Sequence, residues 1–255
     1  MVPVAFLKHR FAAAQSSVLF SATLSPSHFY VDMLGLPVKT PFLDVASPFA
    51  AQQLDVRIAH HISTRYRRRP WSIAPIVDLM ARQYRTRPGN YLLFLSSFDY
   101  LQQVSELFRR LHPDIPVREQ SRQMNETERE AFLARFTAHS TGIAFAVLGG
   151  AFGEGIDLPG DRLIGAFIAT LGLPQINDVN EQMRLRMDAL FGSGYEYTYL
   201  YPGMQKVVQA AGRVIRTQKD QGVVYLIDDR FTQPEVRALL PQWWQLPGQR
   251  KTRLE

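Results

Sequence analysis

The pattern of apolar and polar positions predicts buried strands that alternate with amphipathic helices. Short apolar runs that end in small or hydroxyl residues are typical of parallel strands buried on both faces. On this ground we expect strands at 18–24, 54–62, 91–95, 115–119, 143–148, 163–169 and 223–227. Apolar residues spaced by three and four predict helices at 28–36, 71–84, 97–111, from 125 onward, at 179–191 and at 209–216. This alternation predicts an α/β fold with a mainly parallel sheet.

Two of the predicted helices carry start signals. Ser97 or Asp99 is placed to cap the helix that follows the strand at 91–95, and Asn125 with Glu128 has the spacing of a capping box. The hydroxyl loop of Ser96 and Ser97 therefore joins a strand to a helix. Ligands bind at such loops in parallel sheets, and the helix start offers free N–H groups to a phosphate. A plain connecting turn is the alternative interpretation.

The segment 171–203 departs from the strand–helix alternation. A charged, helix-like stretch at 179–191 is followed by tyrosines at every second position: Tyr195, Tyr197, Tyr199 and Tyr201. Period two predicts an extended segment, whose aromatic face either stacks on bases or packs on the domain; we favour packing. We expect one domain over 1–255 with an insertion at about 171–203, and we exclude Leu254 and Glu255 as typical of a vector-derived tail.

Composition excludes several classes of protein. The 255-residue chain is 46% hydrophobic and 20% charged, which is sufficient for a folded core. It has no cysteine, which excludes disulfides, thiolate catalysis and cysteine-ligated zinc or iron–sulfur clusters within this segment. It also lacks an apolar run of about 20 residues and a secretory signal pattern. We therefore expect a cytoplasmic protein with no membrane association.

The balance of charge points to an anionic partner. Lys and Arg number 29 against 23 Asp and Glu, and the pI is near 9.7. The charge is concentrated at 65–69, Arg-Tyr-Arg-Arg-Arg. Arginine beside an aromatic residue suits a nucleic-acid backbone with occasional base stacking, so Arg65, Arg67 and Arg68 are candidate nucleic-acid ligands. A solvated loop and helix face is the alternative.

Two further stretches carry candidate chemistry. Four glycines lie within seven residues at 149–155, and glycine lets a backbone approach a ligand closely. The spacing fits neither a Walker A loop nor a dinucleotide fingerprint, and a tight surface turn is the alternative. In 209–216, Gln209, Arg213 and Arg216 would share one face of a helix, where two guanidinium groups suit a polyanion. We expect Gly212 to mark a close neighbour of that helix; a solvated basic face is the alternative.

These stretches resemble the conserved motifs of superfamily 2 helicases and occur in the helicase order. Ser21-Ala22-Thr23 is similar to motif III, 91–97 to motif IV, 149–159 to motif V and 209–216 to motif VI. The run from Phe152 to Pro159 is most similar to the DinG/XPD-type branch. The resemblance implies the second RecA-like lobe, a three-layer sandwich in which an insertion between motifs V and VI is expected.

The resemblance also implies roles for individual residues. Catalytic roles fall to Arg213 and Arg216 as arginine fingers on ATP, with Gln209 as a polar sensor. Nucleotide binding and coupling to DNA fall to Ser21, Thr23, Glu154, Gly155 and Asp157. DNA contacts fall to Ser96, Ser97, Gly150 and Phe152, together with the arginines at 65, 67 and 68.

The absence of other helicase motifs bears on what this chain does alone. It has neither a Walker A sequence nor an Asp-Glu-Ala-Asp or Asp-Glu-x-His box, so ATP and Mg²⁺ would be bound mainly by a missing first lobe. We expect the partners to be single-stranded DNA, ATP and the chain's own N-terminal lobe. If the parent protein has an iron–sulfur cluster, its cysteine ligands would lie in that lobe, since this segment has no cysteine, and we expect no metal site here. We expect the fragment alone to be inactive.

Two alternatives remain open. The chain is either a non-catalytic nucleic-acid-binding module on a RecA-like scaffold or a lobe of an RNA helicase. The first has no need for Arg213 and Arg216 in register. Against the second, Leu24-Ser25-Pro26 after motif III and the long insertion favour the DNA branch.

Overall fold

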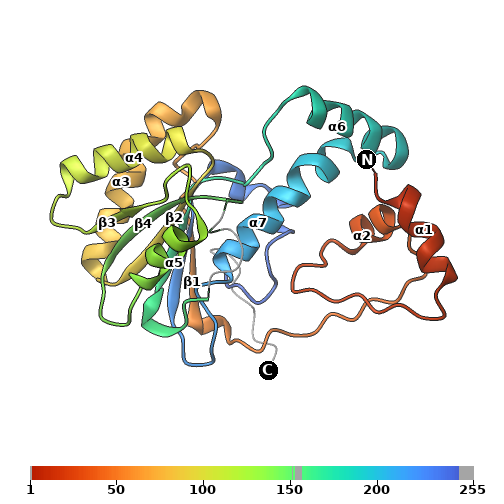
Figure 1. The fold of residues 1–255 in the computed structure, drawn as a ribbon, viewed down its shortest axis with the longest axis horizontal. Coiled ribbons are helices and arrows are strands. Elements are labelled where there is room, and N and C mark those ends of the chain that lie inside the picture. The colour runs from red at the N-terminus through yellow and green to blue at the C-terminus, as the bar shows by residue number, and fades with distance from the viewer. Residues whose placement is uncertain (1, 151, 153–156, 247–255) are drawn as a thin grey trace. The chain divides into compact units, whose positions relative to one another are not determined.

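The larger part of the chain is built on one parallel sheet. The computed structural model describes residues 2–150, 152 and 157–246, and within them the sheet has six strands in the order β1-β6-β5-β2-β4-β3, with every neighbouring pair parallel. This confirms the α/β class (Figure 1). The strands are β1 (Leu54–Ile58), β2 (Asn90–Leu95), β3 (Val117–Glu119), β4 (Gly142–Val147), β5 (Gly165–Ile168) and β6 (Gly222–Leu226).

Helices cover both faces of the sheet, which explains why its strands are apolar throughout. Every residue of β2 is buried. The helices α3 (Arg69–Thr86) and α4 (Phe98–Leu111) pack their apolar stripes on one face. On the other side lie α5 (Glu126–Ala134) and the end of α7 (Tyr201–Ala211) (Figure 1). The shorter elements are α8 (Pro234–Arg237) and the 3-10 helices Ala51–Gln53, Tyr66–Arg68, Gly160–Arg162 and Asp229–Thr232.

Both predicted helix starts are confirmed by their hydrogen bonds. Ser97 Oγ accepts a hydrogen bond from the Tyr100 N–H at 3.3 Å, so α4 begins directly after the hydroxyl loop. Asn125 Oδ1 accepts from the Glu128 N–H and Glu128 Oε2 accepts from the Asn125 N–H, both at 2.9 Å. These bonds satisfy backbone donors that a helix start otherwise leaves unpaired.

The chain divides into two compact units. The larger unit comprises 47–172 and 206–255 and contains the sheet. The smaller unit comprises 1–46 and 173–205, so the predicted insertion at 171–203 falls in it together with the N-terminal segment. Its helices are α1 (Val4–Ala13), α2 (Ser27–Leu34), α6 (Asp178–Phe191) and the π-helix Glu196–Leu200.

The strand predicted at 18–24 is wrong. This segment has no regular secondary structure, and Val18 and Phe20 are 85% and 91% exposed. An apolar run becomes a strand only where another strand pairs with it, and no strand pairs with this run among the described residues. Local contacts shape it instead, since the Thr23 N–H donates to Ser21 Oγ at 3.2 Å.

The prediction that the tyrosine segment is extended is also wrong, because the segment is helical. The rings of Tyr195 and Tyr199 lie 5.9 Å apart and those of Tyr197 and Tyr201 lie 5.7 Å apart, so residues four apart pair as they do along a helix. The alternation therefore reflects two interleaved pairs rather than a strand. Tyr197 and Tyr199 are buried, as the packing alternative predicted.

Candidate nucleotide and nucleic-acid sites

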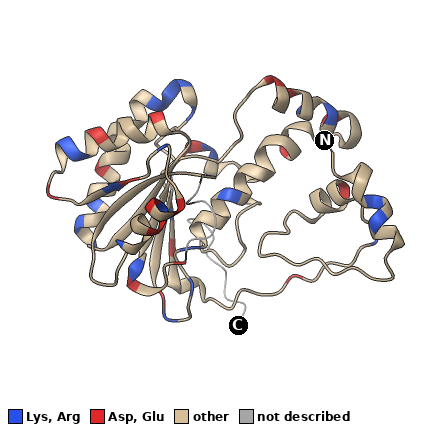
Figure 2. Cartoon of the chain, viewed as in Figure 1, with Lys and Arg blue, Asp and Glu red and all other residues tan. Residues whose placement is uncertain are grey.

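The parallel sheet brings most of the predicted DNA-binding residues to one edge. Because all six strands run in the same direction, their carboxyl ends meet at that edge. The basic segment 65–69 follows β1, Ser96 and Ser97 follow β2, and Gly150 follows β4. Both α3 and α4 begin there (Figure 1), and Figure 2 shows Lys and Arg gathered at the start of α3. The sequence alone did not establish that these loops are neighbours.

Arg69 links the first two of these loops. Its Nη2 donates to Ser96 Oγ at 2.8 Å. Its guanidinium carbon lies 5.0 Å from the centroid of the Tyr66 ring and 5.2 Å from that of the Tyr100 ring, within the range of cation–π contacts. Sequence reasoning counted Arg69 in the basic cluster but named only Arg65, Arg67 and Arg68 as DNA contacts. Its place at the first position of a helix, facing the apolar stripe, is the signal that separates it from them.

The other arginines of the basic cluster are exposed. Arg65 forms an ion pair with Asp229, with Nη2 and Oδ2 3.2 Å apart. Arg67 and Arg68 belong to the 3-10 helix before α3 and face solvent. Solvent-facing guanidinium groups at the carboxyl edge of the sheet are available to phosphates.

A buried carboxylate fixes the start of the basic cluster. Asp228, which follows β6, is fully buried and accepts hydrogen bonds from the Thr64 N–H at 2.8 Å, the Thr64 hydroxyl, the Arg230 N–H at 2.9 Å and Arg230 Nε at 2.6 Å. Burial by itself would raise its pKa, but the hydrogen bonds and charge of Arg230, with the bond from Thr64, lower the pKa to about 2. Asp228 is therefore charged at neutral pH and holds the residue that precedes Arg65.

The glycine-rich segment begins at the same edge. Gly149 has a φ of +80°, a conformation that favours glycine, and a Cβ there would lie 3.2 Å from Lys206 Cδ. A Cβ on Gly150 would lie 3.2 Å from Gln120 Nε2, while Gln120 Oε1 accepts from the Val147 N–H at 2.8 Å. Lys206 beside Gly149 is a cation that sequence reasoning missed. The predicted residues Glu154 and Gly155 lie outside the described residues.

The side chain of Phe152 faces the core, which corrects its assignment as a DNA contact through the ring. Its side chain is fully buried, and its ring centroid lies 4.5 Å from that of Phe132 on α5. An apolar ring gains more from this burial than from exposure at a polar edge. Phe152 therefore anchors the glycine-rich segment to the core.

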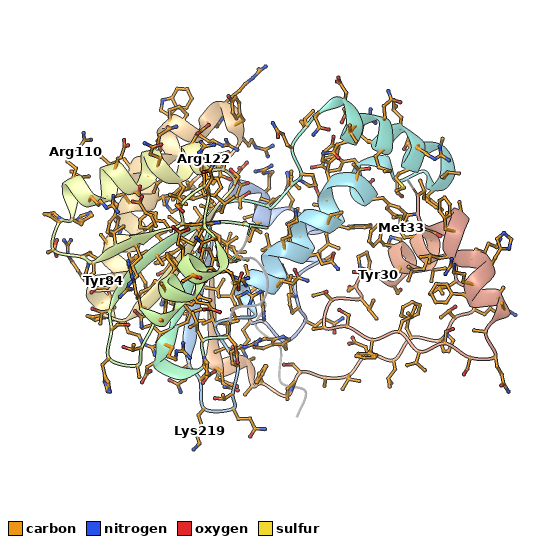
Figure 3. The ribbon with its side chains drawn as sticks, viewed as in Figure 1. Tyr30, Met33, Tyr84, Arg110, Arg122 and Lys219 are labelled. Carbon is orange, nitrogen blue, oxygen red and sulfur yellow. The ribbon has the colours of Figure 1, made fainter. Side chains whose placement is uncertain are left out.

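Arg122 adds a further charge beside the start of α4 (Figure 3). It forms an ion pair with Asp99, and its guanidinium carbon lies 5.4 Å from the centroid of the Phe98 ring. Its position after β3 places it at the carboxyl edge as well. Sequence reasoning assigned it no role, because a lone arginine in a polar loop carries no distinctive pattern.

The helix predicted at 209–216 is wrong at its second half. The helix α7 ends at Ala211, so Gln209 lies on it while Arg213 and Arg216 follow it. Gly212 has no close neighbour from elsewhere: within the described residues, the atoms nearest to a Cβ there are carbonyl oxygens of its own helix. The three predicted catalytic residues therefore do not share one helix face.

Asp220 organises the loop that stands where the second half of this helix was predicted. Its carboxylate accepts from the N–H groups of Arg216 at 2.7 Å and Thr217 at 2.8 Å and from Thr217 Oγ1 at 2.6 Å. A side chain that satisfies backbone donors in this way competes with the helix for them. The segment after α7 is thus a loop held by a carboxylate.

This loop lies at the amino edge of the sheet, away from the basic cluster. It leads into β6, and Gln53, which precedes β1, donates to the carbonyl oxygens of Thr217 at 3.1 Å and Asp220 at 2.9 Å. The chain therefore carries two groups of predicted functional residues at opposite edges of one sheet.

Arg216 and Asp157 meet in this second group. Arg216 Nε donates to Asp157 Oδ1 at 2.8 Å, and the side chains of both residues are substantially exposed, at 40% and 70%. The two residues belong to separate predicted motifs, so the pair joins the end of the glycine-rich segment to the loop after α7. Arg213 is only 9% exposed and Gln209 is half-buried. Of the two arginines predicted as fingers, Arg216 therefore has the more accessible guanidinium.

Ser21 and Thr23 lie in the smaller unit. The carbonyl oxygen of Thr23 accepts from the hydroxyl of Tyr30 at 2.6 Å, and Gln205 Nε2 donates to Thr23 Oγ1 at 3.4 Å. Tyr30 belongs to α2 (Figure 3). These contacts fix the turn that follows the exposed apolar run.

The described part of the chain contains no group of three or more His, Cys, Asp or Glu side chains that could hold a metal ion. None of its helices combines the length and apolar character needed to cross a membrane.

Comparisons with known proteins all point to one family, the helicases. Residues 80–246 match the model of the helicase C-terminal domain. The ATP-dependent DNA helicase chl-1 of Caenorhabditis elegans is 30% identical over 165 residues, which cover 61% of this chain and 20% of the relative. The ATP-dependent helicase DinG of Mycobacterium tuberculosis is 28% identical over 244 residues, which cover 91% of this chain and 36% of the relative. The chain thus spans well under half the length of these relatives.

Solved structures agree on the fold. An apo XPD structure is 19% identical with a TM-score of 0.69, and the match covers 86% of this chain and 45% of that chain. The structure of S. tokodaii Xpd4 is 17% identical with a TM-score of 0.63, and the match covers 93% of this chain and 46% of that chain. These likenesses support the RecA-like architecture.

The Asp228 network generates a stability prediction. Asp228→Asn removes the negative charge that Arg230 pairs with in the core, and breaking a buried pair costs about 3–5 kcal/mol. We expect the free energy of unfolding at pH 7, measured by urea denaturation, to fall by about that amount. Because the pKa of Asp228 is lower in the folded state, the stabilisation from its charge is complete above the unfolded pKa of about 3.9 and is lost as the pH falls towards 2. The difference in the free energy of unfolding between the unmodified chain and Asp228→Asn should therefore narrow over that range.

The neighbouring Asp229 supplies a matched control. Its ion pair with Arg65 is exposed, so Asp229→Asn should cost less than about 1 kcal/mol. Equal losses for Asp228→Asn and Asp229→Asn would contradict the assignment of Asp228 as the buried anchor.

Proposed function

Because this chain belongs to the helicase C-terminal domain family, in its DinG/XPD-type branch, we propose that it is the C-terminal motor lobe of an ATP-dependent DNA helicase. The observation that carries the proposal is the exposed Arg216, which Asp157 holds at the amino edge of a sheet whose carboxyl edge is basic. The coverage of the relatives supports a longer parent protein. Its first lobe would bind ATP with Mg²⁺ and complete the motor.

Arg216 is the leading arginine finger in this proposal. Its guanidinium group would stabilise the charge that develops on the γ-phosphoryl group during transfer. A fork of N–H donors suits phosphate oxygens, and Arg216 is exposed at 40% of its side-chain surface. The burial of Arg213 supports a role in shaping the loop, with Gln209 on the preceding helix as a polar neighbour.

The Asp157–Arg216 pair suggests how hydrolysis is coupled to DNA. The Asp157 carboxylate accepts from Arg216 Nε, a donor that a phosphate would use, so nucleotide binding would exchange one anion for another. The segment that carries Asp157 leaves β4 at the carboxyl edge, near Gly149, and leads into β5 from the amino edge. A shift at Asp157 would therefore reach the DNA edge along one short segment of chain.

Single-stranded DNA would lie along the carboxyl edge. Arg65, Arg67 and Arg68 would contact its phosphates, and the free N–H groups at the start of α4 with Ser96 and Ser97 would offer further donors. Gly150 allows a close backbone approach. Cycles of closure onto ATP and release after hydrolysis would then move the lobe along the strand.

Arg216 gives a direct test in the longer parent protein. Removing an arginine finger costs about 10³-fold or more in kcat, so Arg216→Ala should reduce single-strand-stimulated ATP hydrolysis by about that factor. Arg216→Lys should recover only part of it, because lysine lacks the planar fork. Binding of single-stranded DNA should remain within about twofold of the unmodified protein, because Arg216 lies at the other edge of the sheet. Unchanged ATP hydrolysis in Arg216→Ala would favour a non-catalytic nucleic-acid-binding module.

Asp157 gives a separate test of coupling. The exposed pair with Arg216 contributes at most about 1 kcal/mol to folding, so Asp157→Asn should unfold almost like the unmodified protein. The substitution should instead lower the ratio of the ATP hydrolysis rate with single-stranded DNA to the rate without it. Couplings between sites typically amount to about 5–150-fold, and we expect this ratio to fall by about tenfold. A large loss of stability with an unchanged ratio would mean that Asp157 is structural.

A further inference from the structure

Two large aromatic side chains stand exposed in or next to the basic cluster, which spans residues 65–69. Tyr66 is 80% exposed and Trp71 is 75% exposed. Tyr66 belongs to the 3-10 helix before α3 and Trp71 to the first turn of α3, and Arg67, Arg68 and Arg69 lie between them in the sequence. The arginine–phosphate contacts proposed above use neither ring. Exposed aromatic residues inside a charged cluster are a feature of recognition surfaces rather than of ordinary protein surface.

We propose that Tyr66 and Trp71 form a stacking platform for unpaired bases of a single strand. This inference rests on the proposed function, because it takes the carboxyl edge of the sheet as the path of the strand. It assigns to these two residues the recognition of base faces, while the neighbouring arginines contact phosphates.

The Tyr66 ring is held in place before any ligand arrives. Arg69 lies over it at 5.0 Å, and Arg69 is itself fixed by Ser96 Oγ at 2.8 Å and by the ring of Tyr100 at 5.2 Å. Tyr100 is buried, and its hydroxyl lies 2.5 Å from Ser72 Oγ. A side chain that is ordered in advance loses less conformational freedom on binding. The high exposure of Tyr66 leaves ring surface free for a base.

The charge around the two rings favours a nucleic acid as the occupant. Arg65, Arg67 and Arg68 are exposed next to them in the sequence. The negatively charged phosphates of a nucleic-acid backbone complement such a cluster. Aromatic rings interleaved with arginines match the alternation of bases and phosphates along a single strand. The acidic side chains of a peptide would pair with the arginines but, unlike bases, would not stack on the aromatic faces.

Stacking also supplies a preference that charge alone does not. Phosphates are present on both single-stranded and duplex DNA, so the arginines contribute to binding of either form. In a duplex the base faces already stack on one another, and only an unpaired base has a face free for Tyr66 or Trp71. The platform would therefore favour single strands without reading their sequence, because every base has a π-face.

The experiment compares two oligonucleotide probes with the same phosphates. We would measure the affinity of the 255-residue chain, by fluorescence anisotropy, for oligo(dT) and for an abasic strand of equal length. Stacking on one aromatic residue corresponds to about tenfold in affinity. Tyr66→Leu and Trp71→Leu should therefore each weaken binding of oligo(dT) by about tenfold and leave binding of the abasic strand unchanged. Tyr66→Phe should keep the affinity of the unmodified chain.

Arginine substitutions provide the matched control. Arg67→Ala and Arg68→Ala should weaken binding of both probes by similar factors and should make the dependence of affinity on salt less steep. The Leu variants at 66 and 71 should leave the salt dependence unchanged. Their unfolding midpoints should equal that of the unmodified chain, because both side chains are exposed.

The possible failures are distinguishable. If the chain binds oligo(dT) and the Leu variants bind it equally well, the platform is wrong and the proposed function stands. If the Leu variants lose affinity for both probes alike, the rings act on the backbone and the stacking role is wrong. If the unmodified chain binds neither probe at low salt, the proposed single-strand path fails, and the platform fails with it.

Discussion

The parallel direction of all six strands is the constraint on which both candidate sites depend. It forces every strand to end at the same edge, so loops from distant parts of the sequence become neighbours there. It also forces every connection to return to the opposite edge before the next strand begins. Residues that follow strands and residues that precede them are thereby separated by the length of a strand. The basic cluster belongs to the first class, and the loop with Arg216 belongs to the second.

Carboxylates hold the loops at each edge. Asp228 fixes Thr64 ahead of the basic cluster, and Asp220 fixes the backbone of Arg216 and Thr217. In both cases a side chain at one end of β6 satisfies backbone donors of a loop. Asp157 differs, because it is exposed and contacts a side chain rather than a backbone. The first two contacts suit permanent scaffolding, whereas the third suits a partner that a phosphate can replace.

Much of the fold could be predicted because its strands are buried on both faces. Continuous apolar runs such as 91–95 and 143–148 give strands without ambiguity when helices cover both sides, and Asn125 with Glu128 gives a helix start from local chemistry alone. The run at 18–24 has the same apolar pattern but lacks a neighbouring strand, and no local pattern carries that information. The prediction of an extended segment at 195–201 was wrong for a related reason. Two interleaved pairs of tyrosines, each spaced by four residues along a helix, also place a tyrosine at every second position.

The candidate sites were predictable in type but not in geometry. The residue kinds at 65–69, 149–159 and 209–216 indicated anion recognition, and the family resemblance indicated its purpose. The sequence did not reveal that Phe152 turns inward onto Phe132 or that Arg69 reaches Ser96. Both depend on a contact between segments far apart in the chain. The contact of Asp220 with the Arg216 N–H is local, but no residue pattern shows that this carboxylate, rather than a helix, takes up the backbone donors there.

We propose that this lobe carries an arginine finger for ATP but does not by itself hold and hydrolyse the nucleotide. The most direct measurement is steady-state ATP hydrolysis by the 255-residue chain alone, with saturating Mg-ATP, in the presence of an oligonucleotide that the chain binds. The expected result is no turnover above the buffer background while the strand remains bound. Sustained hydrolysis that depends on the chain would contradict the claim, because it would require a complete nucleotide site within these residues.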